Sequence, residues 1–184
     1  MMEKESHVLD EIDSMARTSL RAAVDEVHPS ASHVVAGDAA TCLLEEIEST
    51  GASLVAVGPR GRSRAAGILL GKVATTLLHD APCSVLLARE PRDPERFPSR
   101  IVVGIDGSPE SERAAEVADE LAERFGAKLE RVVKAAHPVD QLVRLSERED
   151  LVVVGSRGLT GIAALGSVSE RVGHRARCSV LVVR

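Results

Sequence analysis

Two glycine-rich loops carry the residue types that bind phosphate. The first reads Gly58-Pro59-Arg60-Gly61, then nine residues, then Gly71-Lys72. The second reads Gly155-Ser156-Arg157-Gly158, then seven residues, then Gly166-Ser167. Glycines let backbone N–H groups approach an anion, a following helix adds a favourable dipole, and Arg60 or Arg157 would add a charge-assisted contact. Each loop predicts a phosphate site, with tight turns that bind no ligand as the alternative.

Neither loop has the spacing of a Walker A motif. The run Gly67-Ile68-Leu69-Leu70-Gly71-Lys72 is one residue short, and Val73 replaces the hydroxyl that would bind magnesium. Ser167 and Glu170 also form a Ser-x-x-Glu capping box, which explains both as helix starters without any ligand.

Other chemistries find little support in the residue pattern. The six histidines show no metal-ligand spacing, and no Gly-x-Ser-x-Gly elbow accompanies the serines. We interpret the acidic run Glu45, Glu46 and Glu48 as a solvated helix face. We therefore expect neither a metal site nor an enzyme.

Composition argues against nucleic acid and membrane surfaces as partners. The formal net charge is −5, and the only aromatic residues are Phe97 and Phe125, which leaves almost nothing for bases to stack on. No apolar run approaches the roughly 20 residues of a membrane span. The chain has three cysteines, Cys42, Cys83 and Cys178, and no sequence that resembles a signal peptide. We therefore expect a cytoplasmic protein whose thiols are reduced and packed in the core.

The chain is an internal duplication. Leu54–Gly61 matches Leu151–Gly158 at an offset of 97, and Cys83–Leu87 matches Cys178–Val182 at an offset of 95. A stretch from Glu90 to Ser99 separates the copies and holds three prolines and five charges, which is typical of an exposed linker. We predict a first half at residues 1–89, a linker at 90–99 and a second half at 100–184.

Strand and helix patterns alternate in both halves, which predicts parallel sheets covered by helices on both faces. In the first half we expect helices near Val8–Val27, Ala39–Ser49 and Lys72–His79, and strands at His33–Ala36, Ser53–Val57 and Ser84–Ala88. In the second half we expect strands at Arg100–Ile105, Leu129–Val133, Leu151–Val154 and Ser179–Val183, with helices at Pro109–Phe125, Val139–Glu147 and Ser167–Arg175. Ser108 should cap the helix that begins at Pro109, and Gly126 should end it.

Several of these motifs together resemble the universal stress protein family. The resemblance rests on Val102–Ser108, the loop Gly155–Gly158, the run Gly166–Val172 and the closing strand Cys178–Val183. It implies a Rossmann-like or flavodoxin-like α/β fold of the adenine nucleotide alpha hydrolase type, a stress-response role and, usually, a dimer. The family contains ATP-binding and non-binding members. The binding type carries Gly-x-x-Gly, nine residues, Gly-Ser or Gly-Thr, and an aspartate that ends the first strand.

The resemblance places the nucleotide site in the second half. It implies that Asp106 meets the ribose or adenine of ATP, bound with magnesium, and that seven further residues surround the phosphates: Gly155, Arg157, Gly158, Gly166, Ser167, Val168 and Ser169. The second half departs from the pattern in its shorter loop and in a lost helix and strand. The first half has Lys72 in place of Ser or Thr and lacks the aspartate, so we interpret it as a scaffolding copy.

Two functions follow from these features. The first is a regulator that binds an adenine nucleotide without being an enzyme, and Asp106 and Ser167 favour it. The second is an interaction module that binds no nucleotide and pairs its halves, or two copies, through their final strands; the shortened loop and Lys72 favour it. We also expect three strands in the first half, near Val34, Val55 and Val85, and four in the second.

Overall fold

The computed structural model describes residues 14, 15, 17, 18, 20–59, 70–156 and 167–184. The chain forms two compact units, residues 1–42 and residues 43–184. In the first unit, the described residues between 14 and 27 are helical, and residues 31–36 form no helix or strand. Helix α2 (Ala39–Thr50) begins at the end of this unit.

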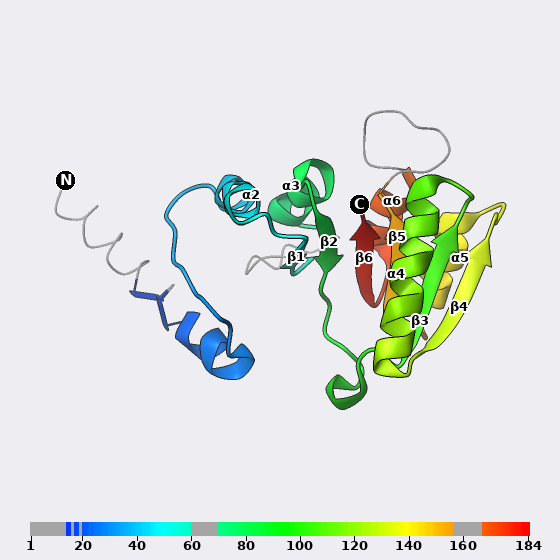
Figure 1. The fold of residues 1–184 in the computed structure, drawn as a ribbon, viewed down its shortest axis with the longest axis horizontal. Coiled ribbons are helices and arrows are strands. Elements are labelled where there is room, and N and C mark those ends of the chain that lie inside the picture. Colours follow the sequence, from blue (N-terminus) through cyan, green and yellow to red (C-terminus); the bar gives the residue numbers. More distant parts are fainter. Residues whose placement is uncertain (1–13, 16, 19, 60–69, 157–166) are drawn as a thin grey trace. The chain divides into compact units, whose positions relative to one another are not determined.

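The second unit contains a six-stranded sheet with helices packed on it (Figure 1). The elements that follow α2 are β1 (Leu54–Val57), α3 (Lys72–Asp80), β2 (Ser84–Leu87), the short 3-10 helix η1 (Pro94–Arg96), β3 (Arg100–Ile105), α4 (Pro109–Phe125), β4 (Lys128–Val133), α5 (Pro138–Leu145), β5 (Leu151–Gly155), α6 (Ser167–Arg175) and β6 (Ser179–Val183). The strand order is β1-β2-β6-β5-β3-β4. Strands β6, β5, β3 and β4 run parallel, as do β1 and β2, and the two groups meet where β2 pairs antiparallel with β6.

The sheet of the second half is covered on both faces. Alanines of α4 pack on one face against a cluster of strand side chains: Ala114, Ala115 and Ala118 with Ile101, Val103, Leu151, Val153, Leu181 and Val183. The other face packs against α5 and α6 (Figure 1) through Leu142, Leu145 and Val172. Because every residue of β6 is buried, its continuous apolar pattern fits a strand with helices on both sides.

Local signals in the sequence correctly located α4. Ser108 accepts a hydrogen bond from the backbone N–H of Ser111 at 3.2 Å, Pro109 occupies the first turn, and Gly126 ends the helix in the left-handed region with φ 63°. Among the other predicted helices and strands of residues 39–184, each is present within two residues of its predicted ends.

One predicted strand is wrong. Residues 33–36 are not a strand, so the described part of the first half contains two strands, β1 and β2, instead of three. A strand needs a neighbour for its backbone N–H and C=O groups, and no described segment pairs with these residues. The four strands expected in the second half are all present.

The two halves are joined by a pseudo-symmetric set of contacts around β2 and β6. Arg89 follows β2 and donates to the carbonyl oxygens of Gly173 at 2.7 Å and Cys178 at 3.1 Å, near the end of α6. Arg184 follows β6 and donates to the carbonyl oxygens of Leu78 and His79, near the end of α3. Arg89 and Arg184 are separated by the repeat offset of 95. Each half thus donates arginine hydrogen bonds, beside the β2–β6 pair, to the end of the last helix of the other half.

Candidate functional site

The strand order places a topological switch point beside β3. The chain leaves β3 through α4 to pair β4 on one side, and then returns through α5 to pair β5 on the other side. In open parallel sheets, ligands bind outside the carboxyl ends of the strands where the order reverses. Asp106 directly follows β3, and Gly155 is the last residue of β5, so two predicted site residues lie at this edge.

Hydrogen bonds hold the Asp106 loop in place. The Oδ1 atom of Asp106 accepts from the backbone N–H of Ser108 at 2.9 Å and from its hydroxyl at 2.6 Å. The backbone N–H groups of Asp106 and Gly107 donate to the Ser111 hydroxyl at 3.3 and 3.2 Å. These bonds fix a half-buried carboxylate at the sheet edge, next to the exposed Gly107 with φ +90°.

Gly155 has a packing role that the sequence did not reveal. A Cβ atom at this position would lie 2.7 Å from the backbone carbon and oxygen of Glu110, in the first turn of α4. Real Cβ atoms do not approach backbone so closely, so the close contact between β5 and α4 requires glycine here. Its contact with phosphate stays a prediction.

The start of α6 lies beside the end of β5. Ser169 is 2% exposed, and its hydroxyl donates to the carbonyl oxygen of Ser156 at 3.3 Å, while Val168 packs on the core. Ser156 in turn donates its backbone N–H to Val183 at 2.9 Å. The predicted Arg157, Gly158 and Gly166 lie outside the described residues, as does the side chain of Ser167, although Ser167 itself begins α6.

The structure adds a cation that the sequence analysis missed. Lys134 follows β4, adopts φ 45°, and donates its backbone N–H to Ile105 at 2.8 Å. Its Cε atom lies 3.6 Å from where a Cβ atom on Gly107 would be, so the side chain extends over the Asp106–Gly107 loop. Its position directly after a predicted strand, at the same edge as Asp106, was the signal that could have identified it.

The described residues fit an anionic nucleotide. A carboxylate offers acceptors to sugar hydroxyls, the exposed Lys134 offers positive charge, and the N-terminus of α6 offers backbone N–H groups. In the described part of the chain, no group of three or more His, Cys, Asp or Glu side chains is placed to hold a metal ion by itself.

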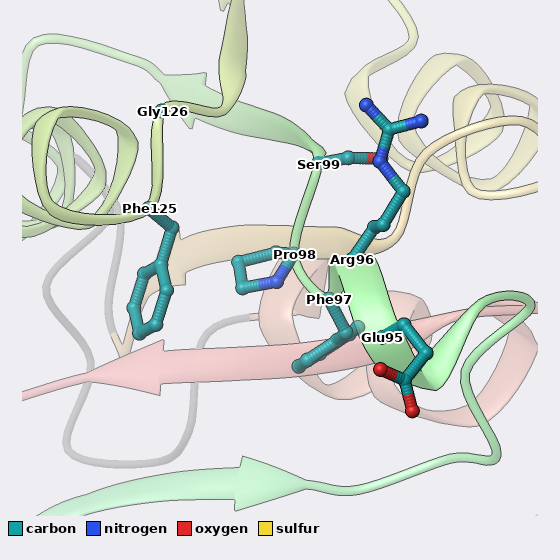
Figure 2. A pocket seen from close by; sticks show the side chains of 7 residues that line it. All are labelled: Glu95, Arg96, Phe97, Pro98, Ser99, Phe125 and Gly126. Atoms are coloured by element: carbon teal, nitrogen blue, oxygen red, sulfur yellow. The ribbon is translucent and has the colours of Figure 1, made fainter.

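A hollow lies at the amino end of β3, opposite the Asp106 edge (Figure 2). The linker and the end of α4 line it: Glu95, Arg96, Phe97, Pro98, Ser99, Phe125 and Gly126. Both aromatic residues of the chain therefore meet in one place, far along β3 from Asp106. Within the described ranges, no helix combines the length and hydrophobicity that a membrane crossing requires.

The comparisons with known proteins decide the family. The model described as "Universal stress protein family" matches residues 1–89, 98–132 and 128–184. The chain belongs to the universal stress protein family. Universal stress protein Rv2623 of Mycobacterium tuberculosis is 33% identical in an alignment 229 residues long, which covers 97% of this chain and 75% of the relative. Universal stress protein Mb2028c of Mycobacterium bovis is 32% identical, over 74% of this chain and 63% of the relative.

Solved structures show the same fold. A universal stress protein from Archaeoglobus fulgidus superposes with a TM-score of 0.76 at 22% identity, covering 97% of this chain and 79% of the other. A functionally unknown Pseudomonas aeruginosa protein, PA1789, superposes with a TM-score of 0.70 at 18% identity, covering 92% of this chain and 77% of the other. The predicted α/β fold of this universal stress protein is confirmed.

Proposed function

We propose that this universal stress protein binds an adenine nucleotide, ATP with magnesium, at the carboxyl ends of β3 and β5. The observation that carries the proposal is the position of Asp106 at the switch point, where Ser108 holds its carboxylate at the same sheet edge as Gly155. Asp106 accepts hydrogen bonds from ribose hydroxyls or the adenine amine in this proposal.

The phosphates lie toward α6. Backbone N–H groups of Ser167, Val168 and Ser169 meet them, because the first N–H groups of a helix have no partner inside the helix. The glycine loop supplies the remaining contacts through Gly155, Arg157, Gly158 and Gly166. The bound nucleotide supplies the negative charge and the magnesium that these groups attract.

We assign this site a regulatory role in a cytoplasmic stress response, with no catalysis. The hydroxyl groups of Ser108 and Ser169 already donate to the Asp106 carboxylate and the Ser156 carbonyl oxygen. Binding that changes the choice of partner is the kind of regulation that we assign to this site.

The test is calorimetric titration of the full chain with Mg·ATP. Wild type should bind one nucleotide per chain with micromolar affinity, and Asp106→Ala should abolish binding. Asp119→Ala is the matched control, because Asp119 is an exposed carboxylate on α4 that pairs with Arg131 and should leave affinity unchanged. Folded wild-type protein that binds nothing up to millimolar Mg·ATP would refute the proposal.

A second function is supported by the junction of the two halves. Strands β2 and β6 pair in the register Val85↔Val182, Leu86↔Leu181 and Leu87↔Val180, and Arg89 and Arg184 reinforce the junction. A chain that uses its final strands in this way is suited to act as an interaction module without nucleotide. That function predicts the negative result of the titration.

A further inference from the structure

Helix α6, whose first N–H groups meet the phosphates in the proposed function, packs directly on the first half. A Cβ atom on Gly173 of α6 would lie 3.0 Å from the Cδ1 atom of Leu87 in β2 and 3.4 Å from the Cδ1 atom of Leu78 in α3. Val172 of α6 belongs to the same buried cluster as Leu77 and Leu78. The first half therefore supports the helix that borders the proposed nucleotide site.

A polar contact joins the same two helices. His79, in the last turn of α3, places its Nε2 atom 3.8 Å from the Oε1 atom of Glu170, in the first turn of α6. The two side chains are 36% and 40% exposed, so they meet at the surface of the junction between the halves. When the imidazole carries a proton, this contact is an ion pair between the first half and the helix of the proposed site.

Glu170 has a second possible partner in its own helix. The Ser-x-x-Glu sequence that begins at Ser167 allows the Glu170 carboxylate to accept from the backbone N–H of Ser167. That N–H is one of the donors that the phosphates meet in the proposed function, and a carboxylate at this end of the helix also repels them. Glu170 therefore competes with the phosphates, and a protonated His79 weakens the competition because it attracts the carboxylate.

The duplication provides an internal comparison for this contact. The repeat offset of 95 relates His79 to His174 and Thr75 to Glu170. Because threonine has no charge, the mirrored position on α3 holds no carboxylate for His174. The ion pair thus belongs to the helix of the proposed nucleotide site and has no equivalent at the start of α3.

Ionisable groups of three elements surround His79: Glu170 of α6, Arg184 after β6 and Asp80, the next residue of α3. Arg184 donates to the carbonyl oxygen of His79 at 3.3 Å. The two carboxylates attract a protonated imidazole, and the guanidinium repels it. A histidine side chain changes its charge between about pH 5 and about pH 8, so the strength of the Glu170 contact depends on pH in this range.

We propose that His79 is a positioning residue for the nucleotide site, because its protonated side chain holds Glu170 away from the phosphates. This role rests on the proposed function and extends it: the first half controls, through pH, the affinity of the second half for its ligand. Nucleotide binding is tight at mildly acidic pH and weakens as His79 loses its proton.

The experiment is calorimetric titration of the full chain with Mg·ATP at about pH 6 and about pH 8. Wild type should bind about twofold to fivefold more tightly than His79→Gln at the lower pH, and equally at the higher pH. This ratio is independent of the nucleotide's own titration, which is the same for both proteins. His174→Gln is the matched control from the other half and should follow wild type at both pH values.

Two further variants separate charge from packing. Glu170→Gln removes the competing carboxylate, so it should gain about twofold to fivefold over wild type at about pH 8 and little at about pH 6. His79→Lys keeps a positive charge beside Glu170 and should also bind more tightly than wild type at about pH 8. A loss of packing at residue 79 would not produce this gain.

The outcomes distinguish this proposal from the proposed function. Wild type that binds Mg·ATP no more tightly than His79→Gln at about pH 6 would overturn the role of His79 and leave the nucleotide site in place. An equal loss of affinity in His174→Gln would do the same. Folded wild-type protein that binds no nucleotide at either pH would overturn both. If His79→Gln does not fold, the gain expected for Glu170→Gln at about pH 8 decides, and its absence would refute the role.

Discussion

At the scale of single residues, the end of β5 meets the first turn of α4 at Gly155. The substitution Gly155→Ala should lower the free energy of unfolding by about 1–3 kcal/mol, because the added methyl group would overlap the backbone of Glu110. Urea denaturation measures this loss. Gly126→Ala is the control: it has space for a Cβ but a φ of 63°, and it should cost only about 1 kcal/mol. Equal losses in the two variants would contradict the overlap.

Cys178 makes stability depend on pH in the alkaline range. Burial raises the pKa of this thiol from 9.0 to about 12, and the charge of Arg89 offsets only part of the rise. The unfolded thiol therefore ionises first as pH increases. Stability from the neutral, buried thiol is complete below the unfolded pKa of 9.0 and is lost as pH approaches about 12.

The expected loss of stability with rising pH can be checked by measuring urea denaturation midpoints at about pH 8 and about pH 10. Wild type should lose more stability over this interval than Cys178→Ala, which has no thiol to ionise. Cys42→Ala is a suitable control, since Cys42 is only partly buried and should follow wild type. Parallel losses in wild type and Cys178→Ala would show that the thiol does not contribute.

At the scale of helices and strands, the residues at helix ends explain which elements could be predicted from the sequence. Ser108, Pro109 and Gly126 act locally, so the sequence alone located α4. The strand expected at His33–Ala36 would need a second strand to pair with. The local sequence pattern could not show that no described segment pairs with these residues. Asp106 and Gly155 were expected at one site from motifs, whereas Lys134 was overlooked, although its position directly after a predicted strand placed it at the same edge.

The reciprocal arginines predict a matched pair of effects on the junction of the halves. Arg89→Met removes donors to the end of α6, and Arg184→Met removes donors to the end of α3. Each should lower the free energy of unfolding by about 1–2 kcal/mol, because carbonyl oxygens near a helix end lose a charged partner. Arg92→Met, in the exposed linker, should change little. A loss in only one of the two variants would refute the symmetric role.

At the scale of the whole second unit, the linker joins halves that already share a sheet and a core. Leu77 and Leu78 of α3 belong to the same buried cluster as Val172 of α6, and β2 pairs with β6. A protease site inserted between Arg92 and Asp93 should therefore yield two fragments that still elute together in gel filtration. Fragments that separate in native buffer would show that the linker, and not the shared sheet, holds the halves together.

The hollow at the amino end of β3 determines what optical spectroscopy can report. Phe97 and Phe125 both line it, and the chain has no tryptophan or tyrosine (Figure 2). Near-ultraviolet circular dichroism of the native protein therefore reports on the linker junction and is blind to the sheet edge at Asp106, where we propose the nucleotide site. The same lack of background makes any single tryptophan introduced beside Asp106 an unambiguous fluorophore for that location.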